Sequence, residues 1–466
     1  MFETGVRQLR MALAMVRGRR IDPRNVERLV ADALATLGVF GRPGDDVQML
    51  LDGPFADPQA RRAFQEQALR RTARRLARRS PHYRALFAST GLDPATLALE
   101  QMPEIPATTK QDLMADPAGF LVEGVPPHIV TRTTGTTGYP VEIWLSRYEM
   151  ELWPALAALS GLLRDEIRPD DCMQVNISSR ATAAMHQNVT VCRLVGAGVR
   201  PLGIVPVEES LDSLLTGGHR APTLLATYPS YLAELVKAAS ARGVGPDELK
   251  LRRIDCGGEV LSDSLERAAR ETLGAPVNDA FMMTEVLPVS ARACEQGHLH
   301  HDLNTGFIEV IDLASGAPAE PGALGTVVIT PYYPYRDCMP VFRHDTRDVV
   351  RRLGEGELTC SLAGVPATSK ILGKAGDLLH VRGRTVTPRE LVEACEALPG
   401  QPWPARYAAR ALPDGLEVVL SPDTAGPLAP DLRLPGVAVA CSVSAEPGLR
   451  RVRADLLETT FTAGRA

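Results

Sequence analysis

Features typical of secreted, membrane-spanning and disulfide-held proteins are scarce in this chain of 466 residues. It contains only 8 cysteines, scattered along its length, which excludes a small disulfide scaffold and favours a reducing compartment. No apolar run is long enough to span a bilayer, and Arg7, Arg10 and Arg17 interrupt every candidate signal-peptide core near the N-terminus. We therefore expect a cytoplasmic protein without a membrane partner.

An excess of charge of either sign is also missing. The chain has 51 basic and 56 acidic side chains, a formal net charge of −5, which argues against a nucleic acid as partner. Hydrophobic residues make up 45% of the chain, so it has enough apolar surface to fold and is not a disordered protein. Its length exceeds what one hydrophobic core usually holds, so we expect two or more lobes.

Residues 69–79 (LRRTARRLARR) form the one local concentration of charge. The arginines recur in pairs four residues apart and leave an apolar stripe along a helix. Such a helix could meet an acidic or nucleotide-bearing partner, or it could be the solvated face of a packed helix. The absence of interleaved aromatic residues favours the solvated face.

The hydrophobic pattern changes along the chain and predicts an α/β fold. Residues 1–125 are predicted to be mostly helical, for example over 60–79 and 109–114. Beyond residue 131, short apolar runs alternate with helical stretches such as 231–239, as in a mainly parallel sheet covered by helices. The strands expected there cover residues 171–177, 223–227 and 251–255.

The later part of the chain predicts two smaller units. Residues 307–312 and 326–330 are predicted strands without a helix between them, which indicates a small antiparallel subdomain. After Gly373 the chain becomes rich in proline, alanine and valine over about ninety residues, the size of a small lobe. The predicted domains are therefore a large N-terminal lobe over 1–372, with 1–125 as a mostly helical lead-in, and a small α+β lobe over 373–466.

Residues 131–140 (TRTTGTTGYP) are the strongest local motif. Glycines allow a tight turn in which backbone N–H groups converge on an anion, and threonine hydroxyls add further donors. The Gly-Lys-Ser/Thr ending of a Walker loop is missing. Taken alone, the motif fits a phosphate-binding loop or a polar hairpin turn.

Further motifs follow this loop, and precede it, in a defined order. They are SPHYRALF (80–87), IPATTKQDL (105–113), APTLLATYPSYL (221–232), DCGGEVLSD (255–263), NDAFMMTEV (278–286), MPVFRHDTRDVV (339–350) and ILGKAGDLLHVRGRTVTP (371–388). Together they resemble the phenylacetate–CoA ligase branch of the AMP-forming adenylating enzymes, which include acyl-CoA synthetases, peptide-synthetase adenylation domains and luciferases. The resemblance extends over residues 80–452 and implies a mobile small lobe.

The resemblance implies a site for ATP and Mg²⁺. Glu285 would bind the magnesium ion, since a carboxylate is the hard oxygen ligand that Mg²⁺ prefers, and Thr284 beside it joins the expected catalytic set. Asp348 would accept hydrogen bonds from the ribose hydroxyls. The other expected nucleotide-binding residues are Thr133, Thr134, Gly135, Thr136, Thr137 and Gly138 for the phosphates, Phe281, Gly257, Gly258 and Glu259 around the adenine, and Asp279 and Lys374.

The implied reaction is ATP-dependent activation of a carboxylic acid. The acid would attack the α-phosphate to give an acyl-adenylate and pyrophosphate, and a thiol such as coenzyme A would then displace AMP. We expect an aryl or otherwise compact acid and a role in a specialised biosynthetic pathway. An amine or other nitrogen acceptor, and a degenerate protein that binds a nucleotide or acyl-adenylate without forming it, are the alternatives. The sequence does not determine the oligomeric state, and a homodimer is one possibility.

The resemblance fails at the residue expected to contact the α-phosphate. Family members usually carry a lysine in the small lobe for this purpose, but Leu449 stands at its expected position. Arg450 or Arg451 could substitute, although the planar guanidinium is not equivalent to a mobile ammonium. Arg450 therefore joins Glu285 and Thr284 as an expected catalytic residue.

Other departures affect the hinge and the pocket. Gly376 stands where a hinge aspartate is usual and leaves Asp377 as the second of the pair. Arg347 replaces the glycine before the ribose-binding aspartate, and Tyr139 replaces the lysine of the phosphate loop. We expect a retained nucleotide pocket with altered machinery for adenylation and lobe rotation.

Three residues are candidates for the acid pocket. Met282 replaces a glycine that ordinarily lines it, so its flexible thioether would either fill part of the pocket or pack into the core. His186 and Tyr228 lie where this family builds the pocket wall, and each could instead be a buried residue with its hydrogen bonds satisfied.

A cluster of cysteines and histidines suggests zinc. Some relatives hold a structural zinc with a Cys and a His in this segment and a later Cys-x-Cys, and thiolate and imidazole suit that metal. Here the candidate ligands are Cys294, His300, Cys338 and Cys360, since the later pair has only one cysteine. A zinc site and a set of unrelated buried cysteines and surface histidines both remain open.

Overall fold

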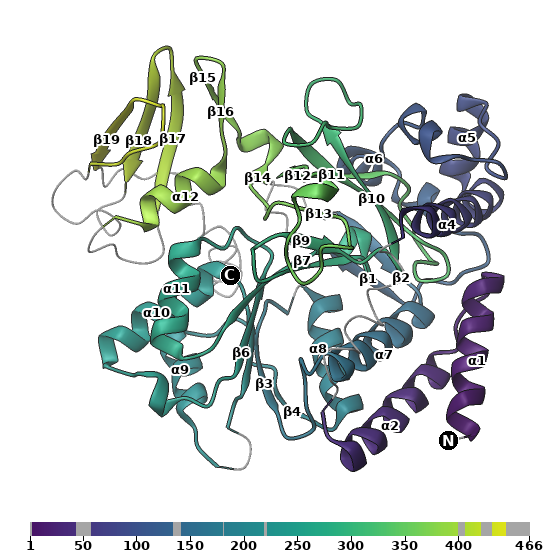
Figure 1. Ribbon diagram of the computed structural model, residues 1–466, viewed down its shortest axis with the longest axis horizontal. Helices are drawn as coiled ribbons and strands as arrows, with labels where there is room; N and C mark the ends of the chain where they lie inside the picture. The colour runs from purple at the N-terminus through teal and green to yellow at the C-terminus, as the bar shows by residue number, and fades with distance from the viewer. Residues whose placement is uncertain are drawn as a thin grey trace.

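The structure is a computed structural model that describes residues 2–42, 57–133, 141–179, 181–218, 221–398, 406–420 and 431–443 (Figure 1). The N-terminal helices lie at one end of the long axis and the small C-terminal lobe lies at the other, with the sheets between them (Figure 1). Among the described residues, no helix is both long and apolar enough to cross a bilayer.

An eight-stranded mixed sheet forms the centre of the large lobe. Its order is β13 (Ala367–Thr368), β9 (Leu299–His301), β8 (Ser290–Ala293), β7 (Val277–Met282), β6 (Arg253–Gly257), β5 (Leu224–Thr227), β3 (Cys172–Asn176) and β4 (Gly198–Arg200). The five strands from β7 to β4 are parallel, and the other three are antiparallel. The α/β fold with a mainly parallel sheet is therefore as the sequence predicted.

Helices cover both faces of this sheet. They are α7 (Arg147–Leu163), α8 (Thr182–Val195), α9 (Val207–Leu215), α10 (Pro229–Arg242) and α11 (Asp263–Leu273). Alternate residues of a strand point to opposite faces, and in β5 Leu225 packs with α9, α10 and α11 while Leu224 and Ala226 pack with α7 and α8. This explains the continuous apolar run TLLAT, because a strand buried on both faces has no polar side.

The predicted strand over 251–255 is displaced. The strand starts at Arg253, because Leu249 and Leu251 are buried in the connection against the α10 and α11 core before the chain pairs with β5. The helix predicted over 231–239 is longer at both ends: Pro229 occupies its first turn, and Gly243 ends it in a left-handed conformation (φ 67°).

The expected antiparallel subdomain is a four-stranded sheet with the order β10 (Gly306–Asp312), β11 (Leu324–Pro331), β12 (His344–Arg351) and β14 (Gly373–Lys374). A separate hairpin of β1 (Ile129–Arg132) and β2 (Glu142–Leu145) precedes α7. These two units matter for function because β12 carries the predicted ribose-binding aspartate and the β1–β2 hairpin carries the predicted phosphate loop.

The first part of the chain is helical, as predicted, and comprises α1 (Phe2–Arg17), α2 (Pro23–Phe40), α4 (Pro58–Arg79), α5 (Pro81–Thr90) and α6 (Lys110–Ala115). The expectation that the arginines of α4 form a solvated face holds only in part. Arg71 donates to the carbonyl of Met15 at 3.0 Å, and Arg75 and Arg20 both pair with the fully buried Asp337. These arginines therefore fix the N-terminal helices to the large lobe.

The small lobe has its own hydrophobic core. It contains β15 (Leu379–Val381), β16 (Arg384–Val386), α12 (Pro388–Glu396), β17 (Tyr407–Leu412), β18 (Gly415–Leu420) and β19 (Val439–Val443). Its α12 lies against α11 of the large lobe, where Glu393 accepts the backbone N–H of Asp263 at 2.9 Å and Glu396 accepts the hydroxyl of Ser262. The domain division at 372/373 stays a prediction; β14 still pairs with the large lobe.

Candidate functional site

The predicted ribose-binding residue Asp348 lies beside Lys374 because β12 and β14 pair in register at these two residues. The Lys374 ammonium is 2.9 Å from the Oδ1 atom of Asp348 and donates to the carbonyl oxygen of Thr346 at 3.1 Å. Lysine on an edge strand thus balances the charge of a carboxylate that is only 6% exposed.

The second carboxylate oxygen of Asp348 is an unused hydrogen-bond acceptor among the described residues. Its Oδ2 atom is buried and has no hydrogen-bond partner among the described residues. A buried acceptor without a donor costs on the order of 1–3 kcal/mol, so such atoms usually mark a place for water or a ligand. The free oxygen fits the ribose hydroxyls that the sequence analysis assigned to Asp348.

Arg347 occupies a backbone position that favours glycine. Its φ is +59°, in the left-handed region, and the resemblance implies a glycine at this position. The strain is partly offset locally, since Arg347 donates its N–H to Asp345 at 2.9 Å and its side chain lies 3.4 Å from the same carboxylate. Arg347 therefore adopts, directly before Asp348, a backbone conformation that glycine would take without strain.

Glu285, the predicted magnesium ligand, lies in a short 3₁₀ turn (Thr284–Val286) directly after β7 and is 3% exposed. Burial lowers the pKa of His344, and the Glu285 carboxylate opposes this lowering. Burial likewise lowers the pKa of Lys110, with Glu285 and Asp348 acting in the opposite direction. The structure thus gathers Glu285 and Asp348 into one group with Lys110, a residue whose role the motif IPATTKQDL did not reveal.

The two glycines predicted beside the adenine are required by packing. A Cβ atom on Gly257 would lie 2.4 Å from the carbonyl oxygen of Ala280, and Gly258 has a φ of +88°. Tyr228 lies next to Gly258, with ring carbons 3.3 Å from where a Cβ would stand. Close approach of β6 to β7 therefore explains Gly257, and the left-handed backbone explains Gly258, without a ligand.

Three other predicted nucleotide contacts have partners within the protein. Glu259 accepts the N–H of Ser230 at 2.8 Å at the start of α10. Phe281 is 8% exposed and packs edge-on to His301, with ring centroids 6.2 Å apart. Asp279 lies 3.6 Å from the Arg389 guanidinium of the small lobe, and burial raises the pKa of this carboxyl to about 6.

Of the predicted phosphate loop, the structure describes only the flanking residues Thr133 and Val141. Thr133 donates its backbone N–H to the carbonyl of Val141 at 3.0 Å, and its Oγ1 atom accepts the N–H of Val141 at 3.0 Å, so the hairpin closes just below the loop. The remaining predicted loop residues, Thr134, Gly135, Thr136, Thr137 and Gly138, lie outside the described residues, as do Leu449, Arg450 and Arg451 of the tail.

Among the residues that the structure describes, no shared contact brings together the three predicted for the acid pocket. His186 lies 3.0 Å from the carbonyl oxygen of Met150 in α7, to which its Nε2–H donates. The Tyr228 hydroxyl accepts the N–H of Ser178 at 3.2 Å, and burial raises the pKa of this phenol to about 12. Met282 is 40% exposed, so the alternative in which it packs into the core is wrong.

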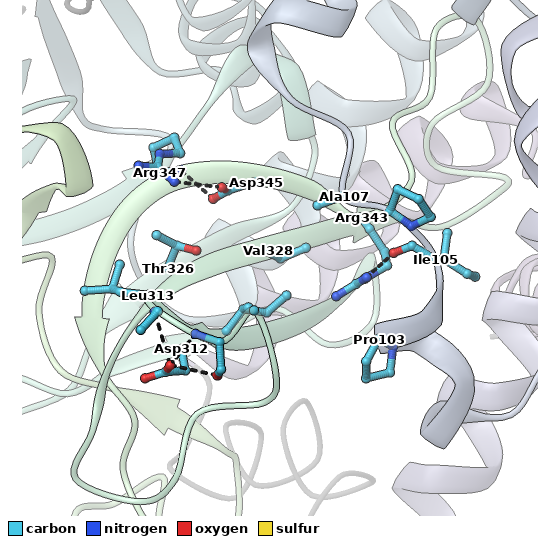
Figure 2. Close-up of a pocket in the computed structure, with 15 residues that line it drawn as sticks. Pro103, Ile105, Ala107, Asp312, Leu313, Thr326, Val328, Arg343, Asp345 and Arg347 are labelled. Atoms are coloured by element: carbon cyan, nitrogen blue, oxygen red, sulfur yellow. Dashed lines mark hydrogen bonds and ion pairs between the residues drawn. The ribbon is translucent and has the colours of Figure 1, made fainter. Parts of the chain in front are cut away.

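A cavity of about 440 Å³ lies on the four-stranded sheet, away from these residues (Figure 2). Residues 103–107, the turn at 312–316 and β12 form its walls, and Asp348 and Lys374 are not among its lining residues. Figure 2 shows Asp345 beside Arg347, and Arg343 directed to the carbonyl of Ile105. Because its charged side chains have partners within the protein and neither Asp348 nor Lys374 lines it, the cavity is not the predicted nucleotide site.

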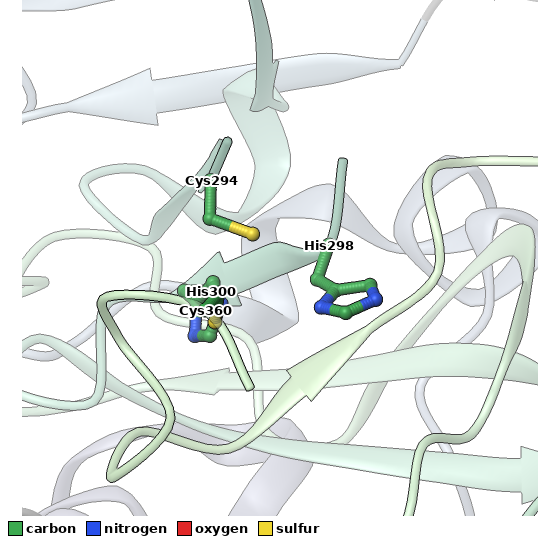
Figure 3. A group of neighbouring side chains, drawn as sticks. All are labelled: Cys294, His298, His300 and Cys360. Atoms are coloured by element: carbon green, nitrogen blue, oxygen red, sulfur yellow. The ribbon is translucent and has the colours of Figure 1, made fainter. Parts of the chain in front are cut away.

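Cys294, His298, His300 and Cys360 form a compact cluster (Figure 3). Their ligand atoms all lie within 4.8 Å of one another, with Cys360 Sγ and His300 Nε2 3.3 Å apart. Cys294 and His298 lie in the turn between β8 and β9, where Gly297 donates its N–H to the carbonyl of Cys294, and His300 lies in β9. Two thiols and two imidazoles at this spacing match the donor set of a tetrahedral zinc site.

Two hydrogen-bonding features support a metal in this cluster. His300 donates its Nδ1–H to the carbonyl of Val365 at 3.0 Å, which directs its Nε2 atom toward the cluster, as partners of zinc-bound histidines do. The Nδ1 atom of His298 is buried and has no hydrogen-bond partner among the described residues. These residues therefore fit a zinc ion.

The predicted zinc ligand set needs one correction. Cys338 is not in the cluster: it is fully buried in the main hydrophobic core, with its Sγ 3.9 Å from the carbonyl of Val125. His298 takes its place. The sequence showed His298 in the same short segment as Cys294, but the spacing along the chain did not indicate that Cys338 belongs to a different layer.

The chain is similar in sequence to curated ligases. It is 29% identical to the phenylacetate-coenzyme A ligase of Thermus thermophilus over 350 residues, which covers 72% of this chain and 76% of that protein. It is 27% identical to the phenylacetate-coenzyme A ligase of Pseudomonas putida, with the same coverage of both chains. No protein-family profile matches the chain.

Solved structures show the same fold. A 2-hydroxyisobutyryl-CoA ligase in its postadenylation state superposes with a TM-score of 0.67 at 18% identity, covering 87% of this chain and 93% of that chain. An anthranilate CoA ligase in complex with anthranoyl-AMP gives a TM-score of 0.51 at 16% identity, covering 72% and 67%. The architecture described above is thus that of acyl-CoA ligases.

Proposed function

Since the chain is related to the phenylacetate–CoA ligases and has the fold of the AMP-forming acyl-CoA ligases, we propose that it activates a carboxylic acid with ATP and transfers the acyl group to an acceptor. The observation that carries this proposal is the group of buried charges around Asp348. Its free Oδ2 oxygen, its lysine partner and the neighbouring Glu285 lie where the motif order assigns the ribose and the magnesium ion.

The proposed reaction has two steps. A carboxylate oxygen of the acid forms a bond to the α-phosphorus of ATP, and pyrophosphate leaves with the electrons of the broken P–O bond. In the second step the sulfur of a thiol attacks the acyl carbon, AMP leaves as a phosphate anion, and the thiol proton passes to water. Both relatives and two solved neighbours carry coenzyme A in their names, which makes it the expected thiol.

Magnesium would be held by Glu285, with Thr284 beside it. The ion would neutralise charge on the phosphates as the pyrophosphate leaves. The 3₁₀ turn presents Glu285 directly after β7, and the 3% exposure of the carboxylate keeps competing water away from the ion. A carboxylate held in this way supplies the hard oxygen that Mg²⁺ prefers.

We propose a compact, preferably aryl, acid as substrate. Met282 stands at the end of β7, three residues before Glu285, so its exposed thioether would occupy space beside the reaction centre. A biosynthetic role is part of the same proposal. Transfer to an amine is the second candidate, since Leu449 replaces the lysine expected for the α-phosphate and this indicates a specialised enzyme.

Pyrophosphate release with Mg·ATP across a panel of aryl and aliphatic acids tests this function. Release that depends on one class of acid supports it, and adding coenzyme A or amines in turn then identifies the acceptor. If the protein binds AMP or an acyl-adenylate analogue but no acid supports release, the protein is a nucleotide-binding partner instead. A cytoplasmic location and a homodimer stay predictions.

We also propose that Cys294, His298, His300 and Cys360 hold a structural zinc ion that joins β9 to the loop before β13. Cys360→Ser should reduce the zinc content from about one ion per chain to near zero, and should lower the melting temperature. The matched control is Cys338→Ala, which removes a buried thiol outside the cluster and should keep its zinc. Metal analysis decides the matter: full zinc content in Cys360→Ser contradicts this site.

A further inference from the structure

A wholly buried arginine has hydrogen-bond donors that the protein does not use. Arg336 lies in the connection between β11 and β12, and its side chain is 0% exposed. Its Nε–H donates to the carbonyl of Met339 at 3.0 Å, and the guanidinium carbon lies 5.4 Å from the centre of the Trp153 ring. The two terminal nitrogens, Nη1 and Nη2, are buried and have no hydrogen-bond partner among the described residues.

Glu149 is the ion-pair partner of Arg336, with its Oε1 atom 3.7 Å from Nε. Both of its oxygens already accept other hydrogen bonds. Oε2 accepts the N–H and the hydroxyl of Ser146 at 2.6 and 2.7 Å, and Oε1 accepts the N–H groups of Asp337 and Cys338 at 2.9 and 3.3 Å. Glu149 therefore balances charge on the Nε side of Arg336 but does not fill the fork formed by Nη1 and Nη2.

The neighbouring carboxylate of Asp337 is also occupied. It is fully buried and pairs with Arg20, which follows α1, and with Arg75 of α4. Three guanidinium groups, including that of Arg336, thus share the two carboxylates of Asp337 and Glu149. This buried cluster is left with one positive charge in excess.

Burial without an acceptor is unfavourable for guanidinium N–H groups, because they lose their hydrogen bonds to water and gain none in return. Burial also lowers the pKa of Arg336, and the carboxylate of Glu149 opposes this lowering. Glu285 acts in the same direction as Glu149, but it is the carboxylate that we assign to magnesium. The open fork therefore marks a place for an acceptor that the described residues do not supply.

We propose that the fork of Arg336 is a binding site for a small carboxylate anion, held by parallel N–H···O bonds from Nη1 and Nη2. A planar guanidinium presents two donors side by side, which matches the two oxygens of a carboxylate better than it matches a spherical halide. One such anion satisfies both terminal nitrogens and cancels the excess charge of the cluster. The site is independent of the proposed reaction.

The site lies where separate parts of the large lobe meet. Glu149 and Trp153 belong to α7, and the indole N–H of Trp153 donates to the carbonyl of Tyr335 at 2.7 Å. Arg336 is the next residue, and Asp337 after it holds the arginines of the N-terminal helices. A bound anion would therefore stabilise the packing of α7 and the N-terminal helices against the connection between β11 and β12.

Ordered water is the competing occupant of the fork. Water also accepts hydrogen bonds from guanidinium N–H groups, but it is neutral and leaves the excess charge in place. The two occupants differ in what they predict for stability. A bound anion stabilises the folded protein in proportion to its occupancy, whereas bound water makes stability independent of which small anion is present.

The experiment measures the melting temperature of the full chain in sodium formate and in sodium chloride at equal concentration and pH. For wild type, saturating formate should give a melting temperature about 2 °C above that in chloride. Arg336→Met removes the fork and its charge, Arg336→Lys keeps only the charge, and both should lose most of this difference. The matched control is Arg71→Met, since Nη1 and Nη2 of Arg71 donate to the carbonyls of Met15 and Val16; it should keep the difference.

Equal melting temperatures of wild type in formate and chloride would overturn the site. So would a formate effect of the same size in wild type and in both Arg336 variants, because a general salt effect acts on all of them alike. If neither Arg336 variant folds, a titration of wild type decides. A formate effect that saturates supports one binding site, and an effect that rises linearly with concentration overturns it.

Discussion

The nucleotide side and the acid side of the proposed site are built in different ways. On the nucleotide side, Asp348 and Lys374 meet through strand register, at a 2.9 Å ion pair that leaves one buried carboxylate oxygen free. On the acid side, His186 and Tyr228 each bind a backbone group of a neighbouring segment, and Met282 is 40% exposed. The nucleotide side thus depends on a buried charge pair, whereas the residues predicted for the acid side are either tied to neighbouring backbone groups or exposed.

The largest expected effect concerns the metal side of the nucleotide site. Glu285→Gln keeps the size of a side chain that is only 3% exposed but removes the charge that would hold magnesium. We expect acid-dependent pyrophosphate release to fall by about 1,000-fold, roughly 4 kcal/mol of transition-state stabilisation. Unchanged release at matched Mg²⁺ concentration would show that the metal is held elsewhere and that the nucleotide side does not depend on this carboxylate.

A smaller effect is expected at the ribose. Asp348→Asn weakens the free acceptor and removes the charge paired with Lys374, so the dissociation constant for Mg·ATP should rise about 10- to 100-fold. Calorimetry can measure this. The matched control is Asp345→Asn, on the same strand but paired with Arg347 at the cavity; it should bind Mg·ATP as wild type does. An equal loss in both variants would point to a general disturbance of β12.

The acid side is tested by Met282→Ala. Removing the exposed thioether should change acid preference in favour of bulkier acids by about tenfold in kcat/KM ratio, with little change in Mg·ATP binding. Leu313→Ala removes a similarly exposed apolar side chain that lines the cavity on the four-stranded sheet and should leave the preference unaltered. If Met282→Ala alters nucleotide binding and not acid preference, Met282 contributes to the nucleotide side and not to the acid side.

The smallest effect on nucleotide binding is expected at Asp279, which we assign to the contact between the lobes and not to the nucleotide site. Burial raises the pKa of this carboxyl from 3.8 to about 6, so its ionisation in the folded protein is unfavourable. The resulting loss of stability is absent below about pH 4 and fully present above about pH 6. Asp279→Asn should therefore be more stable than wild type at pH 8, by up to about 3 kcal/mol, and equally stable at pH 4.

Thermal unfolding across this pH range checks the prediction. Lower stability of Asp279→Asn at pH 8 would mean that the 3.6 Å pair with Arg389 outweighs the cost of burial. Unchanged Mg·ATP binding in the variant would assign Asp279 to the contact between the lobes. Weaker Mg·ATP binding by the variant would support the predicted role of Asp279 in nucleotide binding.

The fold was largely predictable because its signals are local. The run TLLAT, buried on both faces, and the helix pattern that follows it specify a strand and a covering helix without knowledge of distant residues. The order of the charged motifs likewise predicted that Glu285 and Asp348 belong to one site. Arg347 shows the limit of this reasoning: the residue type argues against a left-handed conformation before Asp348, but its φ is +59°.

The remaining features depended on long-range packing. His298 and Cys360 meet because β9 pairs with β13, which no spacing along the chain reveals, and Cys338 was wrongly grouped with them for the same reason. The place of Lys110 depends on a single bridge between Thr108 and β12. Side chains brought together by pairing of distant segments carry no local periodicity, so the sequence alone could not assign them.

The central claim is that this chain forms an acyl-adenylate at the site around Glu285 and Asp348. Exchange of labelled pyrophosphate into ATP tests it most directly, since exchange requires reversible adenylation and no acceptor. We predict exchange that requires both Mg²⁺ and a particular class of acid, persists without coenzyme A, and is lost in Glu285→Gln. Wild-type protein that binds Mg·ATP but supports no exchange with any acid would contradict the account.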